Sequence, residues 1–142
     1  MYRRLGPLLL SAALAACASA ADSSDPIEPE GTVVDARLGQ TFRLKAGGIA
    51  RLGDGIQVFF RGASNDSRCP SDVTCVWSGD ATLHLRVTAG RADWTSLELH
   101  THVLPHAGDF NGHVLTVVDL KPYPKSTDRL SAGDYVAVLR VD

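Results

Sequence analysis

Two cysteines in the stretch NDSRCPSDVTCVWSGD, which runs from Asn65 to Asp80, could do chemistry. Cys69 and Cys75 could form a redox pair, contribute to a metal site or form a structural disulfide. Redox pairs usually have the spacing Cys-x-x-Cys at the start of a helix, where the thiolate is stabilised. Here five residues separate the cysteines, Asp72 would disfavour a thiolate, and no helix signal follows. A structural zinc site has four ligands, whereas this stretch contains only two thiols. The spacing therefore favours a structural disulfide, with metal, redox and free-thiol states as alternatives.

Histidines are the second group with chemical potential. Four of the five histidines lie in HTHVLPHAGDFNGH, from His100 to His113. Alternation along a strand predicted over residues 94–103 places Glu98, His100 and His102 on its outward face. Imidazole and carboxylate groups on one face of a strand are suitable ligands for a transition metal.

A neighbouring strand could complete such a metal site. The predicted hairpin places His84 opposite Ser96 or Glu98, and directly opposed side chains are about 5 Å apart. Zinc or copper could be held there, with His106 or His113 as a further donor. An open sheet face offers no neighbours to orient the ligands, so incidental surface histidines are favoured and a pH-responsive surface is a further alternative. We therefore expect no cofactor. The alternative metal site consists of His84, Glu98, His100 and His102.

Short strands must position these residues. Strand-like runs occur at 32–38, 40–45, 56–61, 81–87, 94–103, 114–120 and 135–141. Residues 81–87 alternate most clearly between apolar and polar types. Residues 114–120 and 135–141 are apolar on nearly both faces, which is typical of central strands covered on each side. A three-residue turn at 89–91 is expected to form a hairpin. No convincing helix is found beyond the N-terminus, and the pattern predicts an all-β fold, an antiparallel β-sandwich of about seven or eight strands.

Apolar and charged residues flank Cys69 and Cys75. Val76 and Trp77 follow the second cysteine, and we interpret them as core residues, with a ligand-facing Trp77 as the alternative. Arg68 has Asp66 and Asp72 nearby, so ion pairs within the loop are expected.

The N-terminal segment MYRRLGPLLLSAALAAC predicts export. Arg3 and Arg4 precede an apolar run over residues 5–13, which is shorter than the about 20 residues that span a bilayer. The segment Leu14-Ala15-Ala16-Cys17 resembles the lipobox of bacterial lipoprotein signal peptides. The resemblance implies a signal peptide over residues 1–16, cleavage before Cys17, and N-terminal acyl chains such as palmitate on that residue. An ordinary secretory signal cleaved near residues 18–20 is the alternative.

Acylation of Cys17 would explain the odd number of cysteines. The remaining two cysteines can then pair in an oxidising compartment. Their disulfide would close a loop of about seven residues and stabilise the fold by about 2–2.5 kcal/mol. Ala18 after the acylated residue, by resemblance to proteobacterial sorting, favours the outer membrane and a domain that faces the periplasm.

The mature chain divides into a tether and one domain. Residues 17–30 comprise the lipidated N-terminus and a stretch of small, acidic and proline residues that is expected to be flexible. Residues 31–142 have the length of a single globular domain. Loss of Arg3 and Arg4 with the signal changes the formal net charge from −2 to −4. An acidic chain without basic clusters argues against nucleic-acid binding.

Several motifs together resemble a group of small uncharacterised bacterial envelope proteins. They are Arg68-Cys69-Pro70, Cys75-Val76-Trp77, Gly79, Leu120-Lys121-Pro122-Tyr123-Pro124 and a closing strand at Tyr135. The resemblance covers residues 42–141; it implies an envelope β-domain and transfers no catalytic residue. The chain also lacks Gly-x-Ser-x-Gly, a glycine-rich phosphate loop and His-Glu-x-x-His.

The sequence thus predicts a non-catalytic binding or structural module of the bacterial envelope. Its expected contacts are the membrane, through the lipid on Cys17, and an envelope protein. The alternative function is periplasmic zinc or copper binding.

Overall fold

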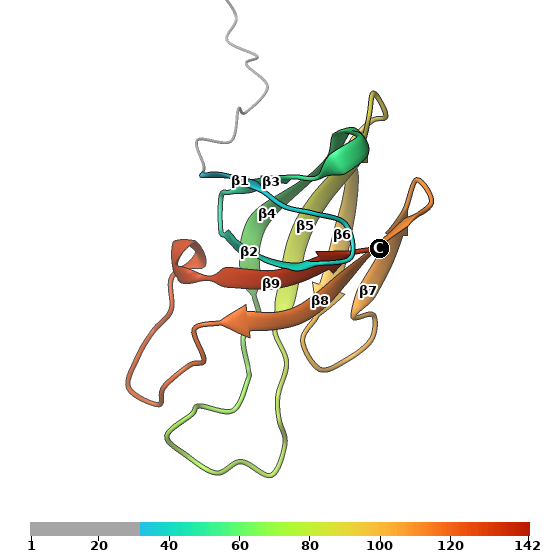
Figure 1. The fold of residues 1–142 in the computed structure, drawn as a ribbon. Helices are drawn as coiled ribbons and strands as arrows, with labels where there is room; N and C mark the ends of the chain where they lie inside the picture. The colour runs from blue at the N-terminus through green and yellow to red at the C-terminus, as the bar shows by residue number, and fades with distance from the viewer. Residues whose placement is uncertain (1–31) are drawn as a thin grey trace, which may run out of the picture.

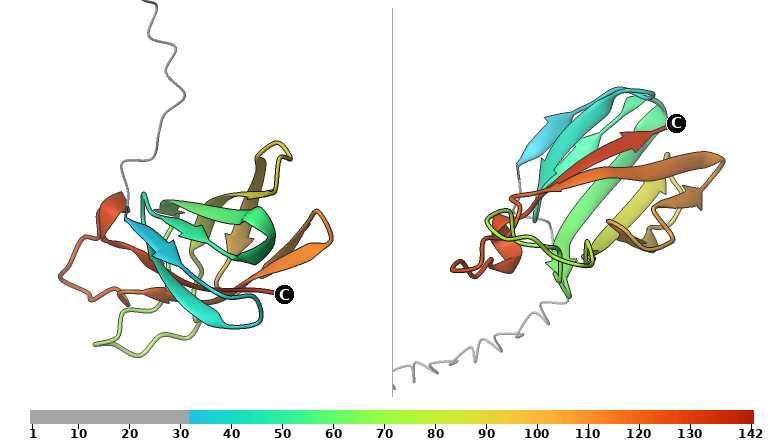
Figure 2. Two further views of the ribbon diagram at one scale, coloured as in Figure 1. Left: turned by 45° about the horizontal axis from the view of Figure 1, so that its top comes forward. Right: turned by 90° about the horizontal axis from the view of Figure 1, so that it is seen from below.

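A computed structural model describes residues 32–142 of the chain. The signal peptide, the acylation of Cys17 and the tether over residues 17–30 are predictions that lie outside the described residues. The described part forms nine strands in two sheets that face each other (Figures 1 and 2). This architecture confirms the all-β sandwich predicted from the sequence. None of the helical segments in the described part of the chain is long and apolar enough to cross a membrane.

The two sheets have five and four strands. The five-stranded sheet contains, in spatial order, β1 (Val33–Asp35), β3 (Ile49–Arg51), β4 (Ile56–Ser64), β5 (Thr82–Ala89) and β6 (Thr95–His100). The four-stranded sheet contains β2 (Thr41–Lys45), β9 (Val136–Val141), β8 (His113–Lys121) and β7 (Ala107–Phe110). Two short 3-10 turns, η1 (Gly53–Gly55) and η2 (Ala132–Asp134), precede β4 and β9.

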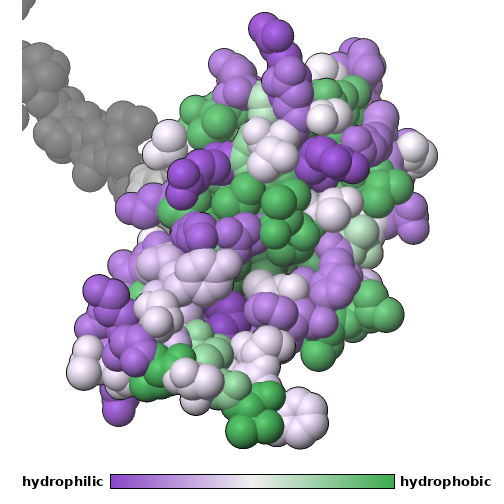
Figure 3. All heavy atoms as spheres, turned by 60° about the horizontal axis from the view of Figure 1, so that its bottom comes forward, coloured by the Kyte–Doolittle hydropathy of each residue, from purple (hydrophilic) through white to green (hydrophobic). Residues whose placement is uncertain are grey.

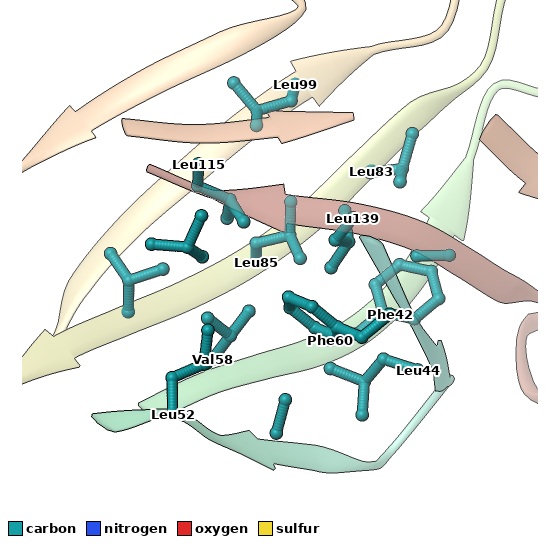
Figure 4. Packing of buried hydrophobic residues seen from close by; sticks show 14 of the residues in the cluster. Phe42, Leu44, Leu52, Val58, Phe60, Leu83, Leu85, Leu99, Leu115 and Leu139 are labelled. Atoms are coloured by element: carbon teal, nitrogen blue, oxygen red, sulfur yellow. The ribbon is translucent and has the colours of Figure 1, made fainter. Parts of the chain in front are cut away.

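The core lies between the sheets and follows from alternation along the strands. On β5, Leu83, Leu85 and Val87 are buried, as their spacing predicted. Phe60 of β4 and Leu139 of β9 pack between the same two layers (Figure 4). Burial of each such side chain is worth about 1.5–3 kcal/mol relative to exposure.

Two details of the predicted sandwich are wrong. The strands β1 and β3 pair in parallel, because the chain leaves for β2 in the opposite sheet and then returns. The strands β8 and β9 are central, but their outer face is open to solvent: Val118 remains 54% exposed beside an irregularity between Val117 and Asp119.

The hairpin of β5 and β6 sets the register of the polar residues. His84 pairs with Glu98, one of the two predicted partners. The loop is longer than predicted, because pairing stops at Val87 and Thr95. Within the turn, the Thr88 hydroxyl donates a hydrogen bond of 2.6 Å to the carbonyl oxygen of Ala92.

Candidate functional site

The connection between β4 and β5, residues 65–81, forms a long loop at one end of the sandwich (Figure 1). We refer to these residues as the stapled loop. A disulfide joins Cys69 to Cys75, whose Cα atoms are 5.9 Å apart. The two arms of the loop also pair: the Ser67 N–H donates to the Asp80 carbonyl, and the Cys69 N–H donates to the carbonyl of residue 78. The loop is therefore closed covalently and by backbone hydrogen bonds.

Arg68 fixes the stapled loop to the sandwich. The residue is only 3% exposed, and its guanidinium donates to both carboxylate oxygens of Asp66, at 2.8 and 2.7 Å. The same guanidinium donates to the carbonyl oxygens of Leu120 and Pro122, where β8 ends. Tyr135, the residue directly before β9, donates from its hydroxyl to Asp66. The predicted ion pair of Arg68 and Asp66 is thus confirmed, and it links the loop to two strands of the opposite sheet.

This network shifts the pKa of both acidic members. Burial opposes ionisation of Asp66, but the hydrogen bonds and charge of Arg68 outweigh it and lower the pKa of that carboxyl. Burial, followed by the negative charge of Asp66, raises the pKa of Tyr135 to about 12. The carboxylate stays charged and the phenol stays neutral, so each hydrogen bond has a defined donor and acceptor.

A second attachment replaces the ion pair that was expected at Asp72. Its carboxylate does not contact Arg68 but accepts hydrogen bonds from the backbone N–H and the hydroxyl of Ser126. These bonds lower the pKa of Asp72. The Ser71 N–H also donates to the Pro124 carbonyl at 2.9 Å. The tip of the stapled loop is therefore tied to the segment that follows β8.

Asp80 makes the third attachment, to the turn after β6. Its carboxylate accepts hydrogen bonds from the N–H groups of His102 and Val103, from the Thr101 hydroxyl and from His100 Nδ1 at 2.7 Å. Burial opposes ionisation, but these donors outweigh it and lower the pKa of Asp80 to about 2. The carboxylate thus closes a turn that would otherwise leave backbone N–H groups without partners.

Val76 and Trp77 are not part of the core, which corrects the interpretation from the sequence. Val76 is 91% exposed and Trp77 is 83% exposed. Both residues lie between Cys75 and the paired backbone of the returning arm, beyond the ends of the strands that enclose the core. Figure 3 shows the molecule from the end that carries the stapled loop, and hydrophobic residues are exposed at its lower edge. The attachments of the loop thus hold two large apolar side chains in water.

The turn after β6 adds apolar surface next to the stapled loop. Val103 and Leu104 are 51% and 81% exposed, and Asp80 joins this turn to the loop through the Val103 N–H. Exposed apolar side chains on neighbouring segments are typical of an interaction surface.

The residues predicted as metal ligands do not form one site. His84 lies across the sheet from Glu98, with Nδ1 3.3 Å from the carboxylate. His100 turns to Asp80, and His102 lies beyond the end of β6 because Asp80 captures its N–H and bends the chain. Among residues 32–142, no three His, Cys, Asp or Glu side chains are placed to hold a metal ion.

The two histidines considered as further donors also lie elsewhere. His106 Nδ1 is 3.1 Å from the carbonyl oxygen of His100, at the end of β6. His113 begins β8, one residue before the predicted strand of 114–120, and its ring centroid lies 5.8 Å from that of Phe110.

Ser64 is a candidate residue that the sequence reasoning missed. It ends β4 on the outer face of the five-stranded sheet, and its hydroxyl oxygen lies 2.7 Å from His84 Nε2. Since His84 Nδ1 faces Glu98, a serine, a histidine and a carboxylate are connected in series across three adjacent strands. The separation of 20 residues between Ser64 and His84 hides this contact until β4 is paired with β5.

The fold and the sites define a disulfide-stapled β-sandwich with an exposed apolar loop. No family model, curated protein or solved structure matches the chain.

Proposed function

We propose that the protein is a lipid-anchored component of the bacterial cell envelope and that its β-sandwich is a binding module. Acylated Cys17 would hold it at the outer membrane, with the domain facing the periplasm. The observation that supports binding is the exposure of Val76 and Trp77, 91% and 83%, on a loop with three attachments to the sandwich. An envelope protein with an apolar pocket would be the partner.

Exposure of this pair has an energetic cost that a partner would relieve. Each Å² of apolar surface removed from water is worth about 25 cal/mol, and tryptophan is enriched among residues that dominate protein interfaces. A disordered loop would lose much of this gain to ordering on binding. Cys69–Cys75 and Arg68 order the stapled loop beforehand, so the domain would bind with little further loss of entropy.

The N-terminal segment is suited to such a role. The 14 residues from 17 to 30 could extend to about 46–50 Å, which exceeds the diameter of a small domain. A tether of this reach would let Trp77 meet a partner away from the membrane surface.

Photocrosslinking from the loop tests the proposal. A photoreactive amino acid is placed at Val76 of the full chain in its native host, or at Val118 as a control, because Val118 is also apolar and exposed but lies on the outer face of β8. We expect a discrete crosslinked product from position 76 only, and in the membrane fraction unless Cys17→Ala removes the anchor. Trp77→Ala should reduce the yield at least ten-fold, with stability changed by no more than about 0.5 kcal/mol.

Two results would contradict the proposal. Equal products from positions 76 and 118 would mean that the loop is not the binding surface. A product from position 76 that is insensitive to Trp77→Ala would mean that the exposed ring does not contribute to binding.

A further inference from the structure

We propose that Ser64, His84 and Glu98 form a catalytic centre that hydrolyses carboxylic esters with small acyl groups. This inference goes beyond the proposed binding role and does not depend on it. The three residues lie on the outer face of β4, β5 and β6, whereas Val76 and Trp77 lie on the stapled loop.

The three side chains have the connectivity of a serine hydrolase. Ser64 Oγ is 2.7 Å from His84 Nε2, and His84 Nδ1 is 3.3 Å from Glu98 Oε1. With its proton on Nδ1, the imidazole donates to Glu98 and accepts from the Ser64 hydroxyl. A nucleophile within hydrogen-bond reach of a base, which is oriented by a carboxylate, is the arrangement that activates a serine.

Strand pairing rather than loop flexibility holds this geometry. His84 lies opposite Gly62 on one side and opposite Glu98 on the other. A bulge between Phe60 and Gly62 adds one residue to β4 and so sets the position of Ser64 relative to His84. Sites built on paired strands are placed more reproducibly than sites on loops.

Gly62 leaves room for a substrate beside the imidazole. Its φ of +140° disfavours other residues, and a Cβ here would lie 3.3 Å from the carbonyl oxygen of Ala132. With no side chain at this position, His84 borders an open hollow of about 350 Å³. The residues that line it are Arg61, Gly62, Ala63, His84 and Ala132.

An adjoining hollow of about 460 Å³ is bordered by Ser64 and shares Ala63 and Ala132 with the first. The shared alanines favour a small acyl group.

Arg61 provides positive charge at this hollow. No ion pair within residues 32–142 involves Arg61, which borders the hollow together with His84. A guanidinium so placed can donate to the oxygen that becomes negative when an ester carbonyl is attacked.

The reaction needs only the ester and water. The Ser64 oxygen bonds to the ester carbonyl carbon as its proton passes to His84 Nε2, and the bond from that carbon to the alcohol oxygen breaks as His84 returns the proton to the alcohol. Water then attacks the acyl-serine, gives a proton to His84, and releases the acid as Ser64 regains its proton. Glu98 acts by positioning the imidazole.

Labelling with a fluorophosphonate tests the proposal on the purified full chain. The reagent reacts with activated serines, and trypsin should release residues 62–68, GASNDSR, which contain both Ser64 and Ser67. We expect fragmentation to place the label on Ser64, with Ser67 as an internal control. Ser64→Ala should abolish labelling, and His84→Gln should slow it at least 100-fold. Ser96→Ala and His113→Gln serve as matched controls and should leave the rate unchanged.

The positioning role of Glu98 is tested separately, by the tautomer of His84 and the rate of labelling. In the native chain, ¹⁵N shifts of the His84 ring should report a proton on Nδ1, and Glu98→Ala should shift the tautomer and slow labelling at least ten-fold.

An unlabelled Ser64, or labelling of Ser64 at the native rate in His84→Gln, would overturn the proposal. Melting curves verify that the variants fold, and His84→Asn replaces His84→Gln if that variant does not.

Discussion

Replacement of Arg68 by methionine is expected to destabilise the domain by about 3–5 kcal/mol. Methionine retains most of the buried length but removes the charge that pairs with Asp66, which then remains poorly solvated. Loss of one partner of a buried ion pair typically has a cost of this size. The carbonyl oxygens of Leu120 and Pro122 lose a donor as well. Urea unfolding followed by far-ultraviolet circular dichroism measures the change.

Arg140→Met is the matched control for Arg68→Met. Arg140 also pairs with an aspartate, Asp142, at 2.7 Å, but both side chains are more than 40% exposed. Exposed pairs contribute about 0–1 kcal/mol, so this variant should unfold almost as the native chain does. Equal losses in the two variants would show that Arg68 is not the anchor of the stapled loop.

Gly79→Ala is expected to destabilise the domain by about 2–6 kcal/mol and to displace the returning arm of the stapled loop. Gly79 has a φ of +67°, and a Cβ there would lie 1.8 Å from the carbonyl oxygen of Ser67. The contact is with backbone, so no side-chain rotation can relieve it. The replacement therefore combines overpacking with left-handed strain, each worth about 1–3 kcal/mol.

The comparison for Gly79→Ala is Gly133→Ala in η2. A Cβ at Gly133 meets no atom within 4 Å, and its backbone does not require glycine. The two variants are compared by thermal unfolding and by hydrogen exchange of the Cys69 amide, which is bonded to the returning arm. Similar melting temperatures and unchanged exchange in Gly79→Ala would contradict the close approach of the two arms.

Local patterns predicted the features that depend on neighbouring residues. The alternation of residues 81–87 predicted the inward face of β5, and the predicted hairpin placed His84 opposite Ser96 or Glu98, of which Glu98 is the observed partner. The same holds for the ion pair of Arg68 with Asp66, two residues away. Each of these features depends only on residues within a single strand, turn or loop.

Features that depend on the assembled fold could not be predicted. The apolar character of Trp77 fits a core and a binding surface equally well, and only the placement of the loop beyond the strands distinguishes them. The strand that was to carry His102 ends early because Asp80, 22 residues away, binds its N–H. The contact of Ser64 with His84 depends on long-range pairing and on a bulge, which alternation alone does not reveal.

Fluorescence of Trp77 tests most directly whether the stapled loop holds an apolar side chain in water on a rigid support. Trp94→Phe leaves Trp77 as the only tryptophan of the chain. We expect emission close to that of tryptophan in water, efficient quenching by acrylamide, and an anisotropy that falls when the Cys69–Cys75 disulfide is reduced. Blue-shifted emission that acrylamide cannot quench would place Trp77 in the core and contradict the exposed loop.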